Sequence, residues 1–394
     1  MLNLRIVLLI LLLSTLSSCQ ITQSNKNTNI MVNESLLLDQ QFPNFSSVAI
    51  ESEQQIFYLS PVMDYMVADK LLTVTNKTKR ARKLIHQIFK TRDLGLVYLS
   101  TANLVASEAY NQNTANCLSL TIMAYALAKK AHLNINFQEV DIPEYWERNG
   151  EYNMLTGHVN LILPIERKPG MLIVYGNKSL QIDFDPYIAK KTFKSHIIDK
   201  NKVIAMYYNN KAAQAIVDKN YTVAYAYLNA AVHKSPNYSN LWGNLGLLYR
   251  LTFNAEFAEK TYSYALALDK NNLTTLSNYA VLLKMIGNVE QAKKINTGLE
   301  QKRRNNPYYQ ALLADEAAYR GDFPLAIKYY KKAIKLDKRI HEFYFGIAKI
   351  YYKLEQFSQA KRAIKKAIAV NRLADVEKNY IAKLNFLKAN EVLH

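Results

Sequence analysis

A repeat with a period of 34 residues occupies the second half of this 394-residue chain and limits what the chain can fold into. Paired helices approach closely only where a small residue lies at their contact, so an alanine that recurs once per period indicates a repeated helix pair. The period predicts an all-α solenoid over residues 205–394, with a solvating C-terminal helix at 375–393. The five blocks begin at Ala205, Ser239, Leu273, Pro307 and His341, and their position 20 is Ala224, Ala258, Ala292, Ala326 and Ala360.

The second block also carries larger residues at fixed positions. Trp242, Leu245, Gly246 and Tyr249 occupy its positions 4, 7, 8 and 11. This pattern resembles the tetratricopeptide repeat, and the resemblance implies five repeats whose first helices line a concave surface. The first block departs from the pattern, because Lys211 and Ala212 stand where leucine and glycine are expected.

The resemblance implies that a protein or peptide ligand binds on the concave face of the repeats. Basic and aromatic residues occur together at the first-helix positions that line this face, and the combination suits a peptide carrying acidic groups. The alternative is that several of the tyrosines only pack between repeats. The residues concerned are Arg250, Lys284, Tyr308, Tyr319, Phe345, Lys349, Tyr352 and Lys353.

Residues 1–18 have the composition of a targeting segment and are excluded from the fold prediction. Arg5 precedes an unbroken apolar run at 6–13 that is too short to span a membrane comfortably. The segment ends in Leu-Ser-Ser-Cys at 16–19, which resembles the end of a bacterial lipoprotein signal. This resemblance implies cleavage before Cys19 and acylation of its thiol. The alternative is an ordinary cleaved signal peptide that contains a cysteine.

By resemblance to Gram-negative lipoproteins, Gln20 after the cysteine implies an outer-membrane protein that faces the periplasm. We therefore expect a lipid-anchored protein of the bacterial cell envelope. Residues 19–45 are rich in Asn, Gln, Ser and Thr, which predicts a flexible tether. The chain has two cysteines, so acylation of Cys19 leaves no second cysteine with which Cys117 can form a disulfide. In an oxidising compartment such a thiol is a liability unless it is buried or used.

Cys117 lies near the start of an apolar stretch, 113–130, that predicts one buried helix. Asn113 or Thr114 is the expected N-cap, because a short side-chain oxygen accepts a hydrogen bond from the first turn. The positive end of a helix favours the thiolate, which is the form of cysteine that attacks electrophiles. The alternative is a cysteine that only fills the core.

Helical and extended patterns alternate around this helix and predict an α+β domain over residues 46–200. A polar segment at 143–154 is expected to form a loop. Helices are expected at 61–72 and 78–89, and strands at 135–140, 157–164, 171–175 and 180–184.

Three motifs in this domain resemble the transglutaminase-like superfamily, which has a papain-like fold. They are Asn116-Cys117-Leu118-Ser119, Gly157-His158-Val159 and Asp183-Phe184-Asp185-Pro186. The resemblance implies that Cys117 is the nucleophile, His158 the general base and acid, and Asp185 the orienting carboxylate. Asp183 is the reserve for the third role, because residues two apart on a strand point to the same face. Leu118 stands where animal transglutaminases have a tryptophan.

The chemistry also requires an oxyanion donor, from the N–H of Cys117 or from a nearby side chain such as Asn116 or Asn160. The expected function is attack on amide or peptide bonds through a thioester, by hydrolysis or acyl transfer, with the repeats recruiting a protein. The alternative is a non-catalytic scaffold lipoprotein whose transglutaminase-like domain is inactive.

Charge and motif content limit the other function classes. The chain has 50 Lys and Arg against 32 Asp and Glu, which favours acidic partners or anionic lipid head groups. The alternative is a solvated lysine-rich surface. The sequence shows no helix-turn-helix, zinc-finger or RNA-binding signature, so nucleic-acid binding is not expected. It also shows no metal-ligand spacing, phosphate loop or cofactor motif, and we expect neither a metal nor a cofactor.

Overall fold

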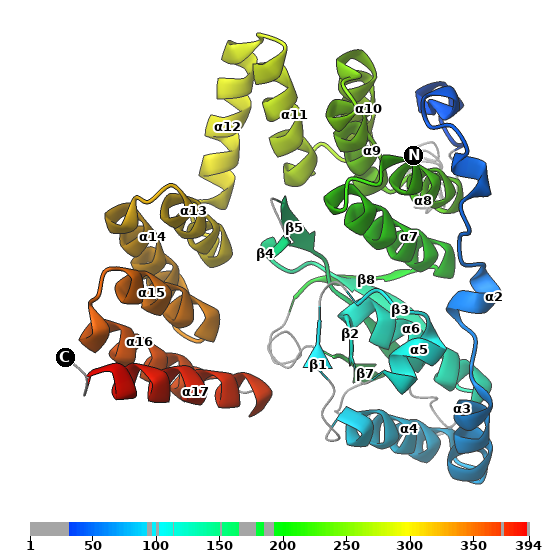
Figure 1. Ribbon diagram of the computed structural model, residues 1–394. Helices are drawn as coiled ribbons and strands as arrows, with labels where there is room; N and C mark the ends of the chain where they lie inside the picture. The colour runs from blue at the N-terminus through cyan, green and yellow to red at the C-terminus, as the bar shows by residue number, and fades with distance from the viewer. Residues whose placement is uncertain are drawn as a thin grey trace, which may run out of the picture. The chain divides into compact units, whose positions relative to one another are not determined.

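The structure is a computed structural model that describes residues 31–92, 97–99, 102–112, 114–149, 152–164, 179–184, 193–371 and 374–391. The chain divides into two compact units, Met1–Met31 and Val32–His394, and the elements described below belong to the second. Its first half contains strands and helices, and helix pairs follow from α7 onward (Figure 1). Within the described ranges, no helix has both the length and the apolar character needed to cross a membrane.

Between Glu53 and the first strand lie four helical elements, which include the helices expected at 61–72 and 78–89. Ser52 caps the first of them, because its hydroxyl accepts the N–H of Gln55 while its own N–H donates to the Gln55 side chain. The elements are α2 (Glu53–Ile56), α3 (Pro61–Met66), the π-helical η4 (Val67–Leu72) and α4 (Lys77–Arg92).

The helix that carries Cys117 begins later than expected. α6 runs over Cys117–Lys130, and its N-cap is Asn116, whose side-chain oxygen accepts the N–H of Ser119 at 2.8 Å. The cap is therefore neither expected residue: Asn113 lies outside the described residues, and Thr114 belongs to β2 (Thr114–Ala115). β2 pairs in parallel with β1 (Val97–Tyr98), and α5 (Ala106–Asn111) lies between these two strands in the sequence. Pairing with β1 keeps the chain extended up to Asn116, so the helix starts there.

Four antiparallel strands form a sheet in the order β7-β6-β3-β8, and α6 packs against β6. β3 and β6 lie in expected ranges, and β7 overlaps the range expected at 180–184. β8 was not expected, and the range 171–175 lies outside the described residues. The strands are β3 (Asn136–Val140), β6 (Val159–Pro164), β7 (Ser179–Ile182) and β8 (Ser195–Ile198).

The segment 143–154 was expected to be a loop, but it is an antiparallel hairpin for most of its length. β4 (Tyr145–Asn149) pairs with β5 (Tyr152–Thr156), with Tyr145 opposite Thr156. Tyr, Trp and Thr favour the extended backbone, which explains why a largely polar segment forms strands.

Antiparallel helix pairs from α7 onward confirm the all-helical solenoid. Four of the five expected blocks begin at the first residue of a helix. The first block was expected to begin at Ala205, but its first helix begins at Lys200. The helices are α7 (Lys200–Val217), α8 (Tyr221–Lys234), α9 (Ser239–Leu251), α10 (Ala255–Leu268), α11 (Leu273–Met285), α12 (Val289–Arg303), α13 (Pro307–Tyr319), α14 (Phe323–Leu336), α15 (His341–Lys353), α16 (Phe357–Val370) and α17 (Ala374–Glu391).

Small residues lie where these helices meet. The five alanines at block position 20 are between 0% and 3% exposed. A Cβ atom on Gly246 would lie 2.7 Å from the Tyr262 ring, so only glycine permits this approach. Gly287 has a φ of 85° and Gly321 a φ of 81°, a conformation that glycine adopts without strain in the turns between paired helices.

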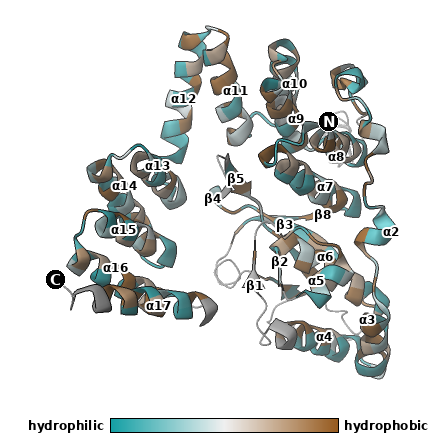
Figure 2. Ribbon diagram, in the orientation of Figure 1, coloured by the Kyte–Doolittle hydropathy of each residue, from teal (hydrophilic) through white to brown (hydrophobic). Residues whose placement is uncertain are grey.

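The buried apolar side chains of the repeats divide at the step from α12 to α13. One core extends from the α+β elements through α12, where Ala292 is a buried member. A second core joins α13–α15, and a third joins α15–α17. Most repeat helices carry both hydrophilic and hydrophobic residues (Figure 2), as expected for helices that bury one face.

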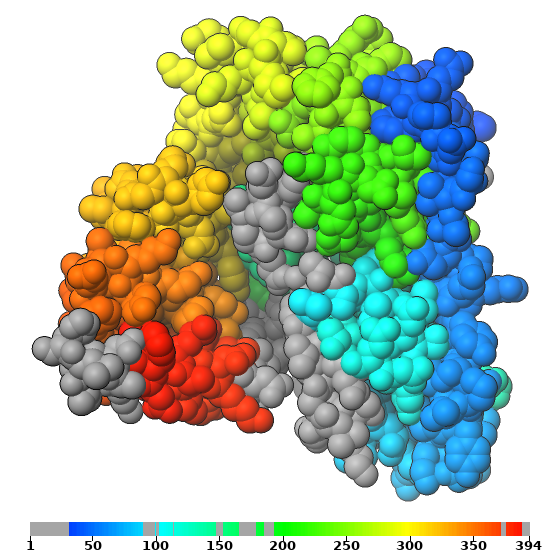
Figure 3. Space-filling model, viewed as in Figure 1, coloured from blue at the N-terminus to red at the C-terminus, as the bar shows by residue number. Residues whose placement is uncertain are grey.

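The segment from Val32 to Ser47 is docked on the repeats and differs from the flexible tether expected for residues 19–45. Phe42 is 2% exposed and stacks on Tyr225 of α8, with the ring centroids 4.3 Å apart. Figure 3 shows this segment in blue against the green repeat helices. Its composition is polar, but its few apolar side chains bury against the repeats. It contains the 3-10 turns η1 (Glu34–Leu36), η2 (Asp39–Gln41) and η3 (Phe45–Ser47).

Candidate functional site

A buried histidine–aspartate pair joins β6 and β7. His158 Nε2 lies 3.0 Å from each carboxylate oxygen of Asp183, and the two side chains are 1% and 4% exposed. The strand register explains the pairing, because His158 directly precedes β6, Asp183 directly follows β7, and Leu161 lies opposite Ile182. Asn160 Nδ2 donates a further hydrogen bond to the same carboxylate at 2.9 Å.

This arrangement fixes the tautomer and the orientation of His158. An ionised carboxylate only accepts hydrogen bonds, so Nε2 carries the hydrogen and Nδ1 is the nitrogen that can accept a proton. A general base needs an imidazole that is oriented in this way.

Cys117 is connected to the same part of the fold through Thr121. It is the first residue of α6 and is half-buried. The Thr121 hydroxyl lies 2.8 Å from the carbonyl oxygen of Cys117 and 3.1 Å from that of Val159, the residue after His158. The first turn of α6, whose N–H groups favour a thiolate, is therefore held against the start of β6.

Asp185, the carboxylate expected to orient His158, lies outside the described residues. The carboxylate that contacts His158 is that of Asp183, which was the reserve for this role. Asn160, a candidate oxyanion donor, uses one N–H to support Asp183. The assignment of Cys117, His158 and Asp185 as a triad stays a prediction.

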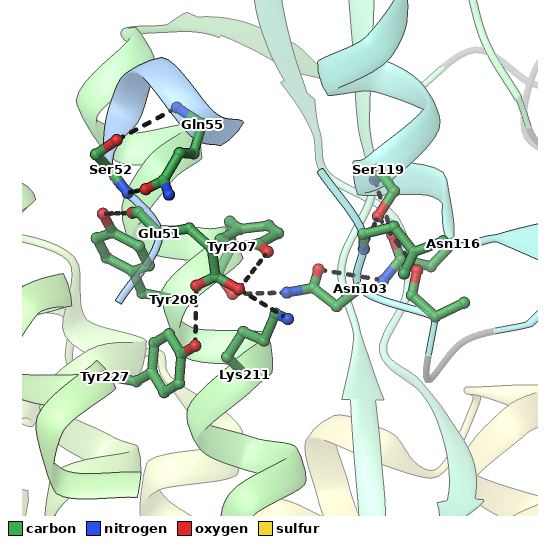
Figure 4. A network of polar contacts seen from close by, with 12 residues as sticks. Glu51, Ser52, Gln55, Asn103, Asn116, Ser119, Tyr207, Tyr208, Lys211 and Tyr227 are labelled. Carbon is green, nitrogen blue, oxygen red and sulfur yellow. Dashed lines mark hydrogen bonds and ion pairs between the residues drawn. The ribbon is translucent and has the colours of Figure 1, made fainter. Parts of the chain in front are cut away.

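A chain of polar contacts connects the start of α6 to the first repeat helix (Figure 4). Asn116 Nδ2 donates to Asn103 Oδ1 at 3.4 Å, and Asn103 Nδ2 donates to the carbonyl of Tyr207 in α7 at 2.9 Å. The Tyr207 hydroxyl in turn donates to Glu51 at 3.1 Å. Asn116, the other candidate oxyanion donor, thus caps α6 and takes part in this chain.

Four of the residues expected to bind a partner are accessible on the first helices of the repeats. Lys284 of α11 and Lys349 of α15 are exposed. Tyr319 of α13 is 85% exposed, and Tyr352 of α15 is 42% exposed. These four accessible side chains are basic or aromatic, and their role in contacting an acidic partner stays a prediction.

Arg250 and Tyr308, two more of the expected contact residues, are packed within the molecule. Arg250 is half-buried, with its Nη1 atom 3.8 Å from the sulfur of Met285. Burial raises the pKa of Tyr262 to about 12, and Arg250 beside it opposes this shift. The Tyr308 ring lies 5.3 Å from the ring of Tyr145 in β4. The alternative given for the tyrosines, packing between repeats, describes Tyr308, whose ring also lies 5.4 Å from that of Phe343 in α15.

A further polar contact lies where the hairpin meets the repeats, and nothing in the sequence indicated it. Glu144 pairs with Arg303, and the two nitrogen–oxygen distances are 2.7 and 2.8 Å. These residues lie 159 positions apart, and no repeat or motif in the sequence links them.

Two segments of the chain, residues 253–316 and 341–372, match sequence models of the family described as Tetratricopeptide repeat. These segments are tetratricopeptide repeats. They contain α10–α12 with most of α13, and α15 with α16. Proteins with tetratricopeptide repeats generally bind protein partners.

Several solved structures are similar to this chain. pilF from Pseudomonas aeruginosa is 16% identical, with 49% of this chain and 90% of that chain covered and a TM-score of 0.30. A tetratricopeptide repeat protein from Parabacteroides merdae is 19% identical, with 47% and 73% covered and a TM-score of 0.28. YrrB, a protein with an unusual peptide-binding site, is 15% identical, with 44% and 90% covered and a TM-score of 0.25. No curated protein matches the chain.

Proposed function

We propose that this chain is a scaffold that holds a protein partner on its tetratricopeptide repeats. The observation that carries the proposal is the presence of these repeats at 253–316 and 341–372. Lys284, Lys349 and Tyr319 supply an accessible basic and aromatic surface on the first helices. The net charge of +18 further favours an acidic partner.

Charge reversal on the first helices tests this proposal. Lys284→Glu with Lys349→Glu is compared with Lys294→Glu and Lys332→Glu, which place the same charge change on exposed positions of the second helices α12 and α14. Capture of protein partners from an extract of the source cells, quantified by mass spectrometry, is expected to fall about tenfold or more for the first pair and less than about twofold for the second. Equal capture by both double variants contradicts the proposal.

A thiol-dependent reaction on an amide is a second candidate function, favoured by the buried His158–Asp183 pair near the first turn of α6. In this reaction Cys117 Sγ attacks the amide carbonyl while His158 Nδ1 accepts the thiol proton. The C–N bond breaks, the amine leaves with that proton, and a thioester forms. Water or a second amine then releases the acyl group and restores the thiol. The motifs at 116–119 and 157–159 support the transglutaminase-like resemblance of this domain.

The pH dependence of Cys117 alkylation separates this candidate from a scaffold whose first domain is inactive. The experiment uses Cys19→Ser protein, in which Cys117 is the only thiol. An unperturbed thiol has a pKa of about 8.5, whereas an activated one reacts readily near pH 6. Fast labelling at pH 6 is expected to be lost in His158→Ala and kept in His196→Ala, which changes an exposed histidine on β8. Labelling that is slow in all variants rejects the thiol reaction.

We also propose that a lipid on Cys19 anchors the protein in the bacterial cell envelope, at the outer membrane facing the periplasm. The apolar run at 6–13 and the Leu-Ser-Ser-Cys sequence at 16–19 support this proposal. Labelled palmitate is expected to be incorporated into the wild-type protein and not into Cys19→Ser. Equal incorporation into both proteins contradicts it.

A further inference from the structure

An ion pair connects the hairpin to the repeats. Glu144 directly precedes β4, and Arg303 is the last residue of α12. Nε and Nη2 of Arg303 lie 2.7 and 2.8 Å from the two carboxylate oxygens, and the Arg303 and Glu144 side chains are 7% and 19% exposed. The Thr274 hydroxyl of α11 donates to the same carboxylate at 3.3 Å. This two-pronged geometry selects a carboxylate over a neutral amide.

A second contact holds the backbone of Glu144. Asn306 Nδ2 donates to the carbonyl oxygen of Glu144 at 2.6 Å. Asn306 Oδ1 accepts the N–H groups of Tyr308 and Tyr309 at 2.9 and 3.3 Å and so caps α13. The cap fixes the position of the carboxamide, which can bind the carbonyl of any extended segment placed there.

Aromatic rings make the third contact. The Tyr145 ring lies 5.3 Å from the Tyr308 ring, and the Trp146 ring lies 6.2 Å from the Tyr309 ring. The Arg303 guanidinium lies over the Trp146 ring at 5.0 Å from its centroid. These distances are typical of aromatic pairs and of cation–π contacts, so the repeats contact both rings that follow Glu144.

These contacts do not form a continuous apolar core. Tyr145 and Trp146 are half-buried, and neither belongs to the buried cores of the described residues. The hairpin packs against α13, at the step where the core of the earlier repeats ends (Figure 1). Polar groups and half-buried rings separate when this contact opens, and no fully buried core side chain does, so we expect it to open more easily than the contacts within the cores.

We infer that Glu144–Trp146, here named the strap, is an internal ligand of the repeats and autoinhibits them. Its binding surface on Thr274, Arg303, Asn306, Tyr308 and Tyr309, here named the strap site, takes an extended peptide of a partner protein in which an acidic residue precedes two aromatic residues. The inference rests on the proposed scaffold function and specifies which side chains the bound segment of the partner carries. The partner peptide must displace the strap, so the strap lowers the apparent affinity of the free protein.

A peptide titration with the full chain tests the inference. The probe is a fluorescent peptide with the sequence of residues 141–149, DIPEYWERN, and its binding is followed by fluorescence anisotropy. The strap variant carries Glu144→Gln, Tyr145→Ser and Trp146→Ser. We expect it to bind the peptide about tenfold or more tightly than the wild type, because its own strap no longer competes.

Two matched changes test the specificity of the strap site. In the strap variant, Arg303→Gln is expected to weaken peptide binding about tenfold or more, whereas Arg304→Gln, at the exposed neighbouring position, changes it less than about twofold. A peptide in which glutamine replaces the first glutamate is expected to bind about tenfold more weakly. Circular dichroism and thermal unfolding establish that each variant is folded.

Equal binding to the wild type and the strap variant, or binding that is unchanged by Arg303→Gln, overturns the inference and leaves the strap as a structural contact. The scaffold proposal is judged separately. If capture still depends on Lys284 and Lys349 when the peptide fails to bind, the scaffold function stands and only the inference fails.

Discussion

Two carboxylates from the first half of the chain contact the repeats in different environments. Glu51 accepts hydrogen bonds from Tyr207 at 3.1 Å and Tyr227 at 2.8 Å, and both tyrosines belong to the large core (Figure 4). Glu144 pairs with Arg303 outside the buried cores. The first helix pair is thus part of the same core as the α+β elements, whereas α13 meets the hairpin through contacts that can separate.

The surroundings of Glu51 suit a charged carboxylate. Burial alone would raise the pKa of Glu51, but hydrogen bonds from its own backbone N–H, Lys211 and Tyr227 lower it overall. Burial raises the pKa of Tyr207 and of Tyr227, so both phenols remain neutral donors. A site with this many donors depends on the carboxylate that accepts from them.

Phe42→Ala is expected to have the largest effect on stability. Phe42 belongs to the same large core as the tyrosines that contact Glu51. Phe42 is buried and stacked on Tyr225, so the free energy of unfolding should fall by about 3–5 kcal/mol in urea titrations. The control is Phe253→Ala, because Phe253 is 93% exposed and its loss should cost less than about 0.5 kcal/mol. Similar small losses in both variants would show that the segment from Val32 is not docked in solution.

Acidification should weaken the C-terminal repeats selectively. Burial lowers the pKa of His341 to about 4, and its Nδ1 atom lies 2.8 Å from the Tyr380 hydroxyl. Glu342 lies 3.2 Å from Nε2, but it is exposed and solvent screens its charge. The unfolded chain has the higher pKa, about 6.5, and therefore binds the proton first. The stability from neutral His341 is present above about pH 6.5 and declines by about 2–3 kcal/mol as the pH falls to about 4.

Hydrogen exchange measured between pH 7 and pH 4 locates this effect. Protection of α15–α17 should decline with pH in the wild type and change less in His341→Gln. An identical decline in the two proteins would assign the pH dependence to other groups.

The two carboxylates can be compared directly by the same substitution. Glu51→Gln should cost about 2 kcal/mol of unfolding free energy, because the donors around it stay buried within a core. Glu144→Gln should lower the free energy of unfolding by only about 1 kcal/mol, because the contact can open and water can then reach the Arg303 guanidinium. Limited proteolysis should nevertheless cleave the hairpin faster in Glu144→Gln than in the wild type, and it should show no such change in Glu51→Gln. Equal costs in urea titrations would remove the distinction between the two attachments.

Two glycines near the core boundary should give the smallest effects, of opposite sign. Gly287 has positive φ, so Gly287→Ala should destabilise the protein by about 1 kcal/mol. Gly298 lies inside α12 with open space around its Cα, so Gly298→Ala should stabilise it by about 0.5–1 kcal/mol. Thermal unfolding measures both changes, and effects of the same sign would contradict the different backbone roles assigned to the two glycines.

Parts of the candidate site were predictable from short-range patterns, and other parts were not. His158 and Asp183 flank adjacent strands. His158 was a candidate through the family resemblance of its motif, and Asp183 was the reserve because it lies two residues before Asp185. The N-cap of α6 was misplaced by two or three residues, because Asn116 and the two expected residues all have suitable side chains. The choice depended on Thr114 and Ala115 pairing with β1, and that pairing is a tertiary contact.

The repeats could be predicted from the sequence alone, because the same local signal recurs every 34 residues and each copy gives the same helix pair. What packs against the repeats depends on tertiary contacts. Phe42 on Tyr225, Glu51 on Tyr207 and Glu144 on Arg303 each join residues more than a hundred positions apart. Such pairs depend on the path of the whole chain, and neither partner has a local pattern that specifies the other.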